Sequence, residues 1–167
     1  MPDPPQRAQQ GTPTGNEEIM DQAWRKDGVR GTAYELTYAG ALSFLRRKYS
    51  RELDGVDIAV SGVPFDSAVT YRPGTRLGPR AVRAASVQLA ELKSFPFGFD
   101  PFDTLGVVDF GDCALDPHSP MSVPDAIESH ARAILETDTT MLTIGGDHFI
   151  AYPLIKAHAA KHGPVAL

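Results

Sequence analysis

Cysteine is the scarcest chemical group in this sequence: among 167 residues there is one, Cys113. A single cysteine excludes an intrachain disulfide, which fits a protein that works in a reducing compartment. The neighbouring carboxylates of Asp109, Asp112 and Asp116 are expected to raise the pKa of this thiol, because they disfavour its anion. We therefore do not expect Cys113 to act as a catalytic nucleophile.

Long apolar runs and an excess of basic charge are also missing. No stretch approaches the ~20 apolar residues that a membrane helix needs, and the segment 1–5 has no basic and apolar regions of a secretory signal. The net charge is −5, with 16 basic and 21 acidic residues, which disfavours a nucleic-acid partner. We expect the one basic cluster, Arg46-Arg47-Lys48, to be a solvated helix face. These absences predict a cytoplasmic protein with no nucleic-acid and no membrane partner.

The first thirty residues have little with which to build a core. They are rich in Pro, Gln, Gly and Thr, and their few large apolar side chains cannot offset the entropy lost on ordering. Trp24 is the exception, and we expect it to anchor the segment. We predict a flexible N-terminal arm over residues 1–30, followed by part of a single α/β domain over residues 31–167.

Strand and helix patterns alternate from residue 56 onward. The predicted strands are 56–60, 105–109 and 140–144, and the predicted helices are 79–92, 123–136 and 150–162. This alternation predicts a mainly parallel sheet with helices on both faces, a three-layer αβα architecture. The chain closes on the apolar run 164–167, which resembles the start of another strand. We therefore expect the fold to be incomplete, with C-terminal strands missing.

Two helix starts carry recognisable signals. Gly78 and Pro79 open the first helix, since proline at the first helical position sacrifices no hydrogen bond. Ser122 is expected to cap the second helix. The first helix is predicted to bury an apolar stripe and to turn two arginines elsewhere. The stripe is Val82, Ala85, Leu89 and Leu92, and the arginines are Arg80 and Arg83.

The segment 140–148 carries the most chemical information in the chain. A β-branched and apolar run ends at Gly145-Gly146 and delivers Asp147 and His148 just before a helix. In open α/β sheets, ligands bind at the carboxyl ends of the strands, so this turn lies at a functional rim. His148 fits a metal ligand, a general base or a hydrogen-bonded structural residue. A phosphate site is a weaker alternative, because an acid occupies the anion position and no GxGxxG or Walker lysine is present.

A second candidate feature is the long segment 63–78, which carries Asp66, Arg72 and Arg76. Loops of this length in compact domains are often binding loops. The remaining histidines are interpreted as structural. We expect His130 and His158 to be hydrogen-bonded packing residues, His162 to interact with a helix C-terminus and His118 to be exposed.

Three motifs together resemble the ureohydrolase (arginase/agmatinase) family. They are Gly62-Val63-Pro64-Phe65-Asp66, the stretch 72–80 that reads Arg-Pro-Gly-Thr-Arg-Leu-Gly-Pro-Arg, and Gly145-Gly146-Asp147-His148. From about Tyr34 to Leu167 the chain is similar to the N-terminal half of an agmatinase-type member. The resemblance implies an arginase-like fold and Mn²⁺-dependent hydrolysis of a guanidino compound, agmatine or a guanidino acid such as guanidinobutyrate, to urea and an amine.

The resemblance also assigns residues. His148 corresponds to a ligand of one ion of a Mn²⁺ pair, and Asp147 to a partner behind it that orients the site. The family's other ligands lie on later strands, and Asp57 and Asp109 are expected to be hydrogen-bonding residues that do not replace them. Phe149 departs from the Ser or Thr common after the histidine.

Further expectations follow from the resemblance. No catalytic residue is assigned within this chain, its substrate-binding residues stay unassigned, and the chain alone is expected to be inactive. Family members are usually homo-oligomers, trimers or hexamers. The alternative from another class is a non-catalytic half-domain that acts in assembly or pairs with a second chain.

Overall fold

The computed structural model describes residues 21–25, 28–33, 35–90 and 93–166. Most of the predicted N-terminal arm lies outside these ranges, so its boundary at residue 30 stays a prediction. The short helix α1 (Gln22–Arg25) belongs to the described part. In it, the ring of Trp24 lies 5.1 Å from that of Tyr49, although Trp24 is 63% exposed.

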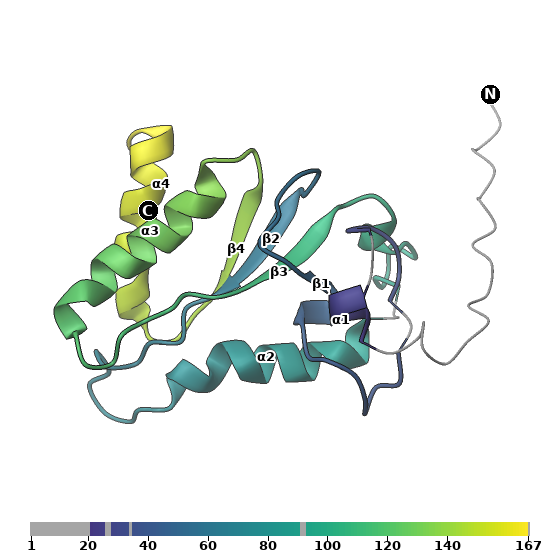
Figure 1. Ribbon diagram of the computed structural model, residues 1–167, viewed down its shortest axis with the longest axis horizontal. Coiled ribbons are helices and arrows are strands. Elements are labelled where there is room, and N and C mark those ends of the chain that lie inside the picture. The colour runs from purple at the N-terminus through teal and green to yellow at the C-terminus, as the bar shows by residue number, and fades with distance from the viewer. Residues whose placement is uncertain (1–20, 26–27, 34, 91–92, 167) are drawn as a thin grey trace.

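Four parallel strands form the centre of the molecule (Figure 1). They are β1 (Lys48–Tyr49), β2 (Ile58–Gly62), β3 (Val107–Asp112) and β4 (Thr140–Ile144), in the order β1-β3-β2-β4. All three strand pairings of this sheet are parallel, which confirms the predicted sheet. Strands β2 and β3 begin two residues later than predicted. Just before β2, the side chain of Asp57 accepts hydrogen bonds from Gly106 N and Arg30. The two-residue β1 was not predicted.

Helices cover both faces of the sheet. On one face lie α3 (Val123–Leu135) and α4 (Ala151–His162), side by side in Figure 1, and on the other lies α2 (Gly78–Ser86). Val108 and Phe110 of β3 point toward α3 and pack with Ile134. Asp109, between them in sequence, points to α2. The predicted three-layer αβα arrangement is therefore confirmed, and no helix among the described residues is long and apolar enough to cross a membrane.

Short 3-10 helices connect the main elements. They are η1 (Phe44–Arg46), η2 (Thr75–Leu77), η3 (Val87–Leu89), η4 (Pro101–Asp103), η5 (Pro120–Ser122) and η6 (His148–Ile150). Ser122 does not cap α3 with its side chain, contrary to the prediction. Its backbone is already helical, and its hydroxyl donates to Ser119 O at 2.8 Å, because η5 precedes α3 without a break.

The apolar stripe predicted for the helix 79–92 is wrong, and α2 itself ends at Ser86, with Leu89 in η3. Val82 is 40% exposed and Leu89 57% exposed, whereas Arg83 is only 6% exposed. Leu92 lies outside the described residues. The helix turns an arginine to the sheet because the sheet presents carboxylates there, so charge pairing overrides the apolar pattern.

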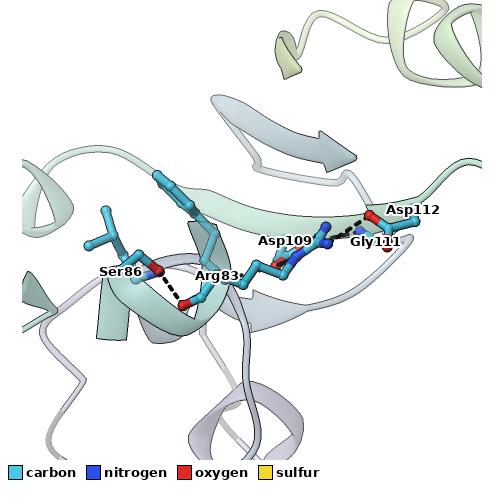
Figure 2. A network of polar contacts seen from close by, with 7 residues as sticks. Arg83, Ser86, Asp109, Gly111 and Asp112 are labelled. Carbon is cyan, nitrogen blue, oxygen red and sulfur yellow. Dashed lines mark hydrogen bonds and ion pairs between the residues drawn. The ribbon is translucent and has the colours of Figure 1, made fainter. Parts of the chain in front are cut away.

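A bulge in β3 creates that acidic surface. Gly111 has φ +82°, in the left-handed region that favours glycine, and the register between β2 and β3 shifts at this point. The extra residue brings Asp109 and Asp112 to the same face of the sheet. Figure 2 shows Arg83 reaching both: its Nε lies 2.6 Å from Asp109 Oδ2 and its Nη1 lies 2.6 Å from Asp112 Oδ1.

The basic cluster is also placed differently from the expectation of a solvated helix face. Arg46 and Arg47 are each 1% exposed. Arg46 forms a buried ion pair with Glu35. Arg47 donates to Gly31 O at 2.8 Å and lies 4.0 Å over the Phe102 ring. Burial lowers the pKa of Arg47 to about 10. Gly31, Glu35 and Leu36 of the preceding segment lie against these side chains and supply hydrogen-bond and ion-pair partners in place of solvent.

Candidate functional site

The glycine turn after β4 leads directly into η6 and α4, as the sequence pattern predicts. Asp147 has extended backbone angles, and its Oδ1 accepts a hydrogen bond from Phe149 N at 3.0 Å. Aspartate is favoured at this position because its carboxylate satisfies an amide that has no partner inside the helix. The turn therefore positions His148, the first residue of η6, at the carboxyl end of β4.

The backbone of segment 63–78 packs directly against the backbone of this turn. A Cβ atom added at Gly146 would lie 1.8 Å from Phe65 O, and one added at Gly78 would lie 2.8 Å from Gly145 O. Both positions therefore require glycine for a close approach. The binding-loop segment 63–78 and the Gly145-Gly146 turn therefore form one structural unit.

Asp147 joins these segments through hydrogen bonds. Its backbone N donates to Phe65 O at 2.7 Å, and its Oδ2 accepts from Ala68 N at 2.9 Å. Both carboxylate oxygens are thus occupied by backbone amides, and the residue is 9% exposed. Asp147 connects the loop, the turn and the helix start around His148.

His148 itself is exposed, and its ring makes no hydrogen bond or ion pair within the described residues. The neighbouring Phe149 is 37% exposed and its ring lies 5.5 Å from that of Phe65. Among the residues that the structure describes, no group of three or more His, Cys, Asp or Glu side chains is placed to hold a metal ion. His148 is thus one accessible donor, and the described residues do not fit a complete metal site.

Asp66 organises the loop from within. Its side chain is fully buried, and its Oδ2 accepts from Gly74 N at 2.6 Å and from Arg76 N at 3.2 Å. Its Oδ1 pairs with the Arg76 guanidinium. The hydrogen bond from Arg76 is the main cause that lowers the pKa of Asp66 to about 2. The sequence pattern marks Asp66 only as a charge in a binding loop and does not reveal this role. The available signal is the Asp and Arg ten residues apart around Pro73-Gly74.

The outer part of the loop is open to solvent. Tyr71 is 81% exposed, and the guanidinium of Arg72 lies 4.9 Å from its ring centroid. Behind the loop lies a pocket of about 330 Å³, whose walls include Phe65, Asp66, Arg76, Cys113 and Asp116. That the loop binds a ligand stays a prediction.

Cys113 is buried at 3% exposure. Burial is the main cause that raises the pKa of its thiol to about 11; Asp112 adds to the shift and Arg51 opposes it. The predicted direction of the pKa shift is confirmed, but Asp109 and Asp116 do not cause it.

The two carboxylates expected to be hydrogen-bonding residues do form hydrogen bonds: Asp57 accepts from Gly106 N at 2.6 Å and Asp109 from Phe44 N at 2.8 Å.

The other histidines lie away from the glycine turn. His130 Nε2 lies 2.6 Å from Ser61 Oγ, and the ring packs edge-on against Phe110, so its predicted structural role is confirmed. His118 is exposed, as expected. His158 was expected to be hydrogen-bonded, but its buried Nδ1 has no hydrogen-bond partner within the described residues. Its ring packs instead against that of His162, 6.2 Å away.

Comparison with known proteins places this architecture in a family. The family model described as "Arginase family" matches residues 56–167. An agmatinase of Chromobacterium violaceum is 59% identical over 148 residues, which cover 88% of this chain and 46% of that protein. An agmatinase of Neisseria meningitidis serogroup C is 42% identical over 112 residues, covering 66% of this chain and 36% of that protein.

Solved structures agree with the sequence matches. A hypothetical agmatinase from Burkholderia thailandensis superposes with a TM-score of 0.84 at 62% identity and covers 86% of this chain and 45% of its own. Proclavaminate amidino hydrolase from Streptomyces clavuligerus has a TM-score of 0.72 at 34% identity, covering 79% of this chain and 44% of its own. This chain spans about half the length of these relatives. The fold is arginase-like, and the chain belongs to the arginase family.

Proposed function

We propose that this chain supplies part of a Mn²⁺-dependent amidinohydrolase that cleaves a guanidino compound to urea and an amine. The observation that carries the proposal is the accessible imidazole of His148, held at the carboxyl end of β4 by a turn that hydrogen bonds fix from two sides. The names of the relatives support agmatine as substrate, with a guanidino acid such as guanidinobutyrate as the close chemical alternative.

His148 is the residue that would hold a metal ion. A neutral imidazole is a suitable ligand for a divalent transition metal, and a bound Mn²⁺ would supply an activated water for attack on the guanidino carbon. Hard cations of this type also need several oxygen ligands, which the described residues do not gather around His148. No catalytic step is therefore assigned to this chain, and we infer that the 167 residues alone are inactive.

A non-catalytic role is the second candidate, and the outer edge of β4 favours it. Strand β4 is the last strand of the sheet order and pairs only with β2 among the described residues. Leu142 on this strand is 47% exposed. An open edge of this kind can bind another strand, which favours a half-domain that pairs with a second chain.

A cytoplasmic location, a small-molecule ligand and a homotrimer or homohexamer complete the leading proposal.

Metal analysis and urea release test the two candidates. We expect the purified 167-residue chain to release no urea from agmatine and to retain fewer than two Mn²⁺ ions per chain. We expect a longer family protein that contains this chain to release urea, and His148→Ala to abolish that release. Undiminished activity of His148→Ala would refute the ligand assignment. Two tightly bound ions in the 167-residue chain would refute the conclusion that its ligand set is incomplete.

A further inference from the structure

Asp66 lies in sequence between the two residues that hold the His148 turn, yet within the described residues its carboxylate makes no hydrogen bond or ion pair to that turn. Phe65 O accepts from Asp147 N at 2.7 Å, and Ala68 N donates to Asp147 Oδ2 at 2.9 Å. Asp66, between them in sequence, points the other way and binds the far side of its own loop. Any movement of Asp66 therefore displaces the backbone groups that fix Asp147.

The contacts of Asp66 join the two ends of its loop, residues 66 and 74–76, into a closed ring of residues. One carboxylate oxygen accepts two backbone amides, from Gly74 and Arg76, and the other oxygen pairs with the Arg76 side chain. Charge-assisted hydrogen bonds of this kind are stronger than neutral ones, and a buried carboxylate that lost them would be left without compensation. The ring is thus fixed at its base, while Tyr71 and Arg72 at its tip stay exposed.

We propose that Asp66, paired with Arg76, is a positioning residue for the proposed metal ligand His148. It fixes segment 65–68, this segment fixes Asp147, and Asp147 fixes the first turn of η6 that carries His148. The inference rests on the proposed function for the meaning of His148. Its physical content, a coupling between Asp66 and the His148 turn, requires neither a metal ion nor turnover.

Amide hydrogen exchange of the full 167-residue chain tests this coupling. In Asp66→Ala we expect the amides of Ala68 and Asp147 to exchange at least about tenfold faster, the effect of losing roughly one charge-assisted hydrogen bond. The amides within β2 and β3 are expected to keep their rates once the change in global stability is subtracted. In Arg76→Ala, where Asp66 keeps its two backbone partners, we expect a smaller increase at the same amides.

Asp57→Ala is the matched control. Like Asp66, Asp57 pairs with an arginine, here Arg30, and it accepts one backbone amide where Asp66 accepts two. It lies just before β2, away from the glycine turn. We expect this variant to speed exchange at Gly106 and to leave Ala68 and Asp147 unchanged.

The NMR signal of the His148 ring gives a second readout. We expect it to shift or broaden in Asp66→Ala, while the signal of His118, an exposed histidine on another loop, stays in place. Faster exchange at Gly74 with no change at Asp147 would overturn the proposal, because Asp66 would then organise only its own loop. A uniform rise in exchange across the sheet in both Asp66→Ala and Arg76→Ala would also overturn it. If these signals respond as expected and a longer protein releases no urea, the coupling stands and the proposed function fails.

Discussion

Arg83 on α2 donates two hydrogen bonds to the carboxylate of Asp109 on β3, Nε to Oδ2 at 2.6 Å and Nη2 to Oδ1 at 2.9 Å. Its third nitrogen reaches Asp112, which the bulge at Gly111 turns to the same face (Figure 2). This fork joins the helix that follows the loop 63–78 to the centre of the sheet. The loop is thereby anchored at its C-terminal end, on the side opposite α3 and α4.

Removing this arginine is expected to be strongly destabilising. Arg83→Leu leaves the Asp109 carboxylate buried without its cation, which costs about 3–5 kcal/mol of unfolding free energy. Urea denaturation of both proteins measures the loss. Val82→Ala, on the exposed side of the same helix, is the control and should change stability by no more than about 0.5 kcal/mol. Equal effects of the two substitutions would contradict the observed orientation of α2.

Stability should depend on the protonation of His130. Burial, reinforced by the charge of Arg51, lowers the pKa of His130 from 6.5 to about 4 in the folded chain. Between these pH values the unfolded state binds the proton more readily, so stability is fully present above pH 6.5 and is lost as the pH falls toward 4. The midpoint of urea unfolding, measured from pH 4 to 7, should therefore rise more steeply in the native protein than in His130→Gln. Identical slopes would show that the imidazole does not titrate in this window.

Gly146 should not accept a side chain. In Gly146→Ala the new Cβ would meet the backbone oxygen of Phe65 at 1.8 Å, so the loop or the turn must move, at a cost of about 1–3 kcal/mol. Thermal unfolding of the variant measures this cost. Gly28→Ala, where nothing lies within 4 Å of the added Cβ, is the matched control and should be close to neutral. A stable Gly146→Ala protein would mean that the loop does not press on the turn.

Cys113 should react slowly with thiol reagents in the native state. Its side chain is buried, and its pKa of about 11 leaves little thiolate at pH 8. We expect labelling by a disulfide reagent to be negligible under native conditions and complete in denaturant, as followed by absorbance. Rapid labelling of the folded protein at the rate of the denatured one would disprove the burial of this thiol.

His148→Ala should leave the fold unchanged. The side chain is exposed and makes no hydrogen bond within the described residues, so the unfolding free energy should change by no more than about 0.5 kcal/mol. Asp147→Ala, by contrast, removes two acceptors of backbone amides and should cost about 1–3 kcal/mol. Urea denaturation of the two variants compares the two costs. A large loss of stability in His148→Ala would favour the structural interpretation of this histidine over the metal-ligand one.

The sequence by itself determined the elements whose signals are local. Each strand and helix follows from apolar periodicity over a few neighbouring residues, and the alternation of these elements predicts the parallel sheet. The position of Asp147 and His148 after β4 follows from the two glycines that end this strand. The family motifs added the expectation for His148. The sequence did not show that the side chain of Asp57 binds Gly106 N, because the two residues lie 49 positions apart.

Only the tertiary structure decided how charges are paired. Arg83 meets Asp109 across 26 residues and Ala68 meets Asp147 across 79, and neither distance leaves a periodic signal in the sequence. The same holds for Arg46 and Arg47, whose burial depends on a segment that folds over them. Apolar residues bury wherever a core exists, but a buried charge needs one particular partner in one particular direction. That partner is set by the packing of elements, and for Arg83 also by the bulge at Gly111 that brings Asp109 and Asp112 to one face, so it becomes visible only when the chain is folded.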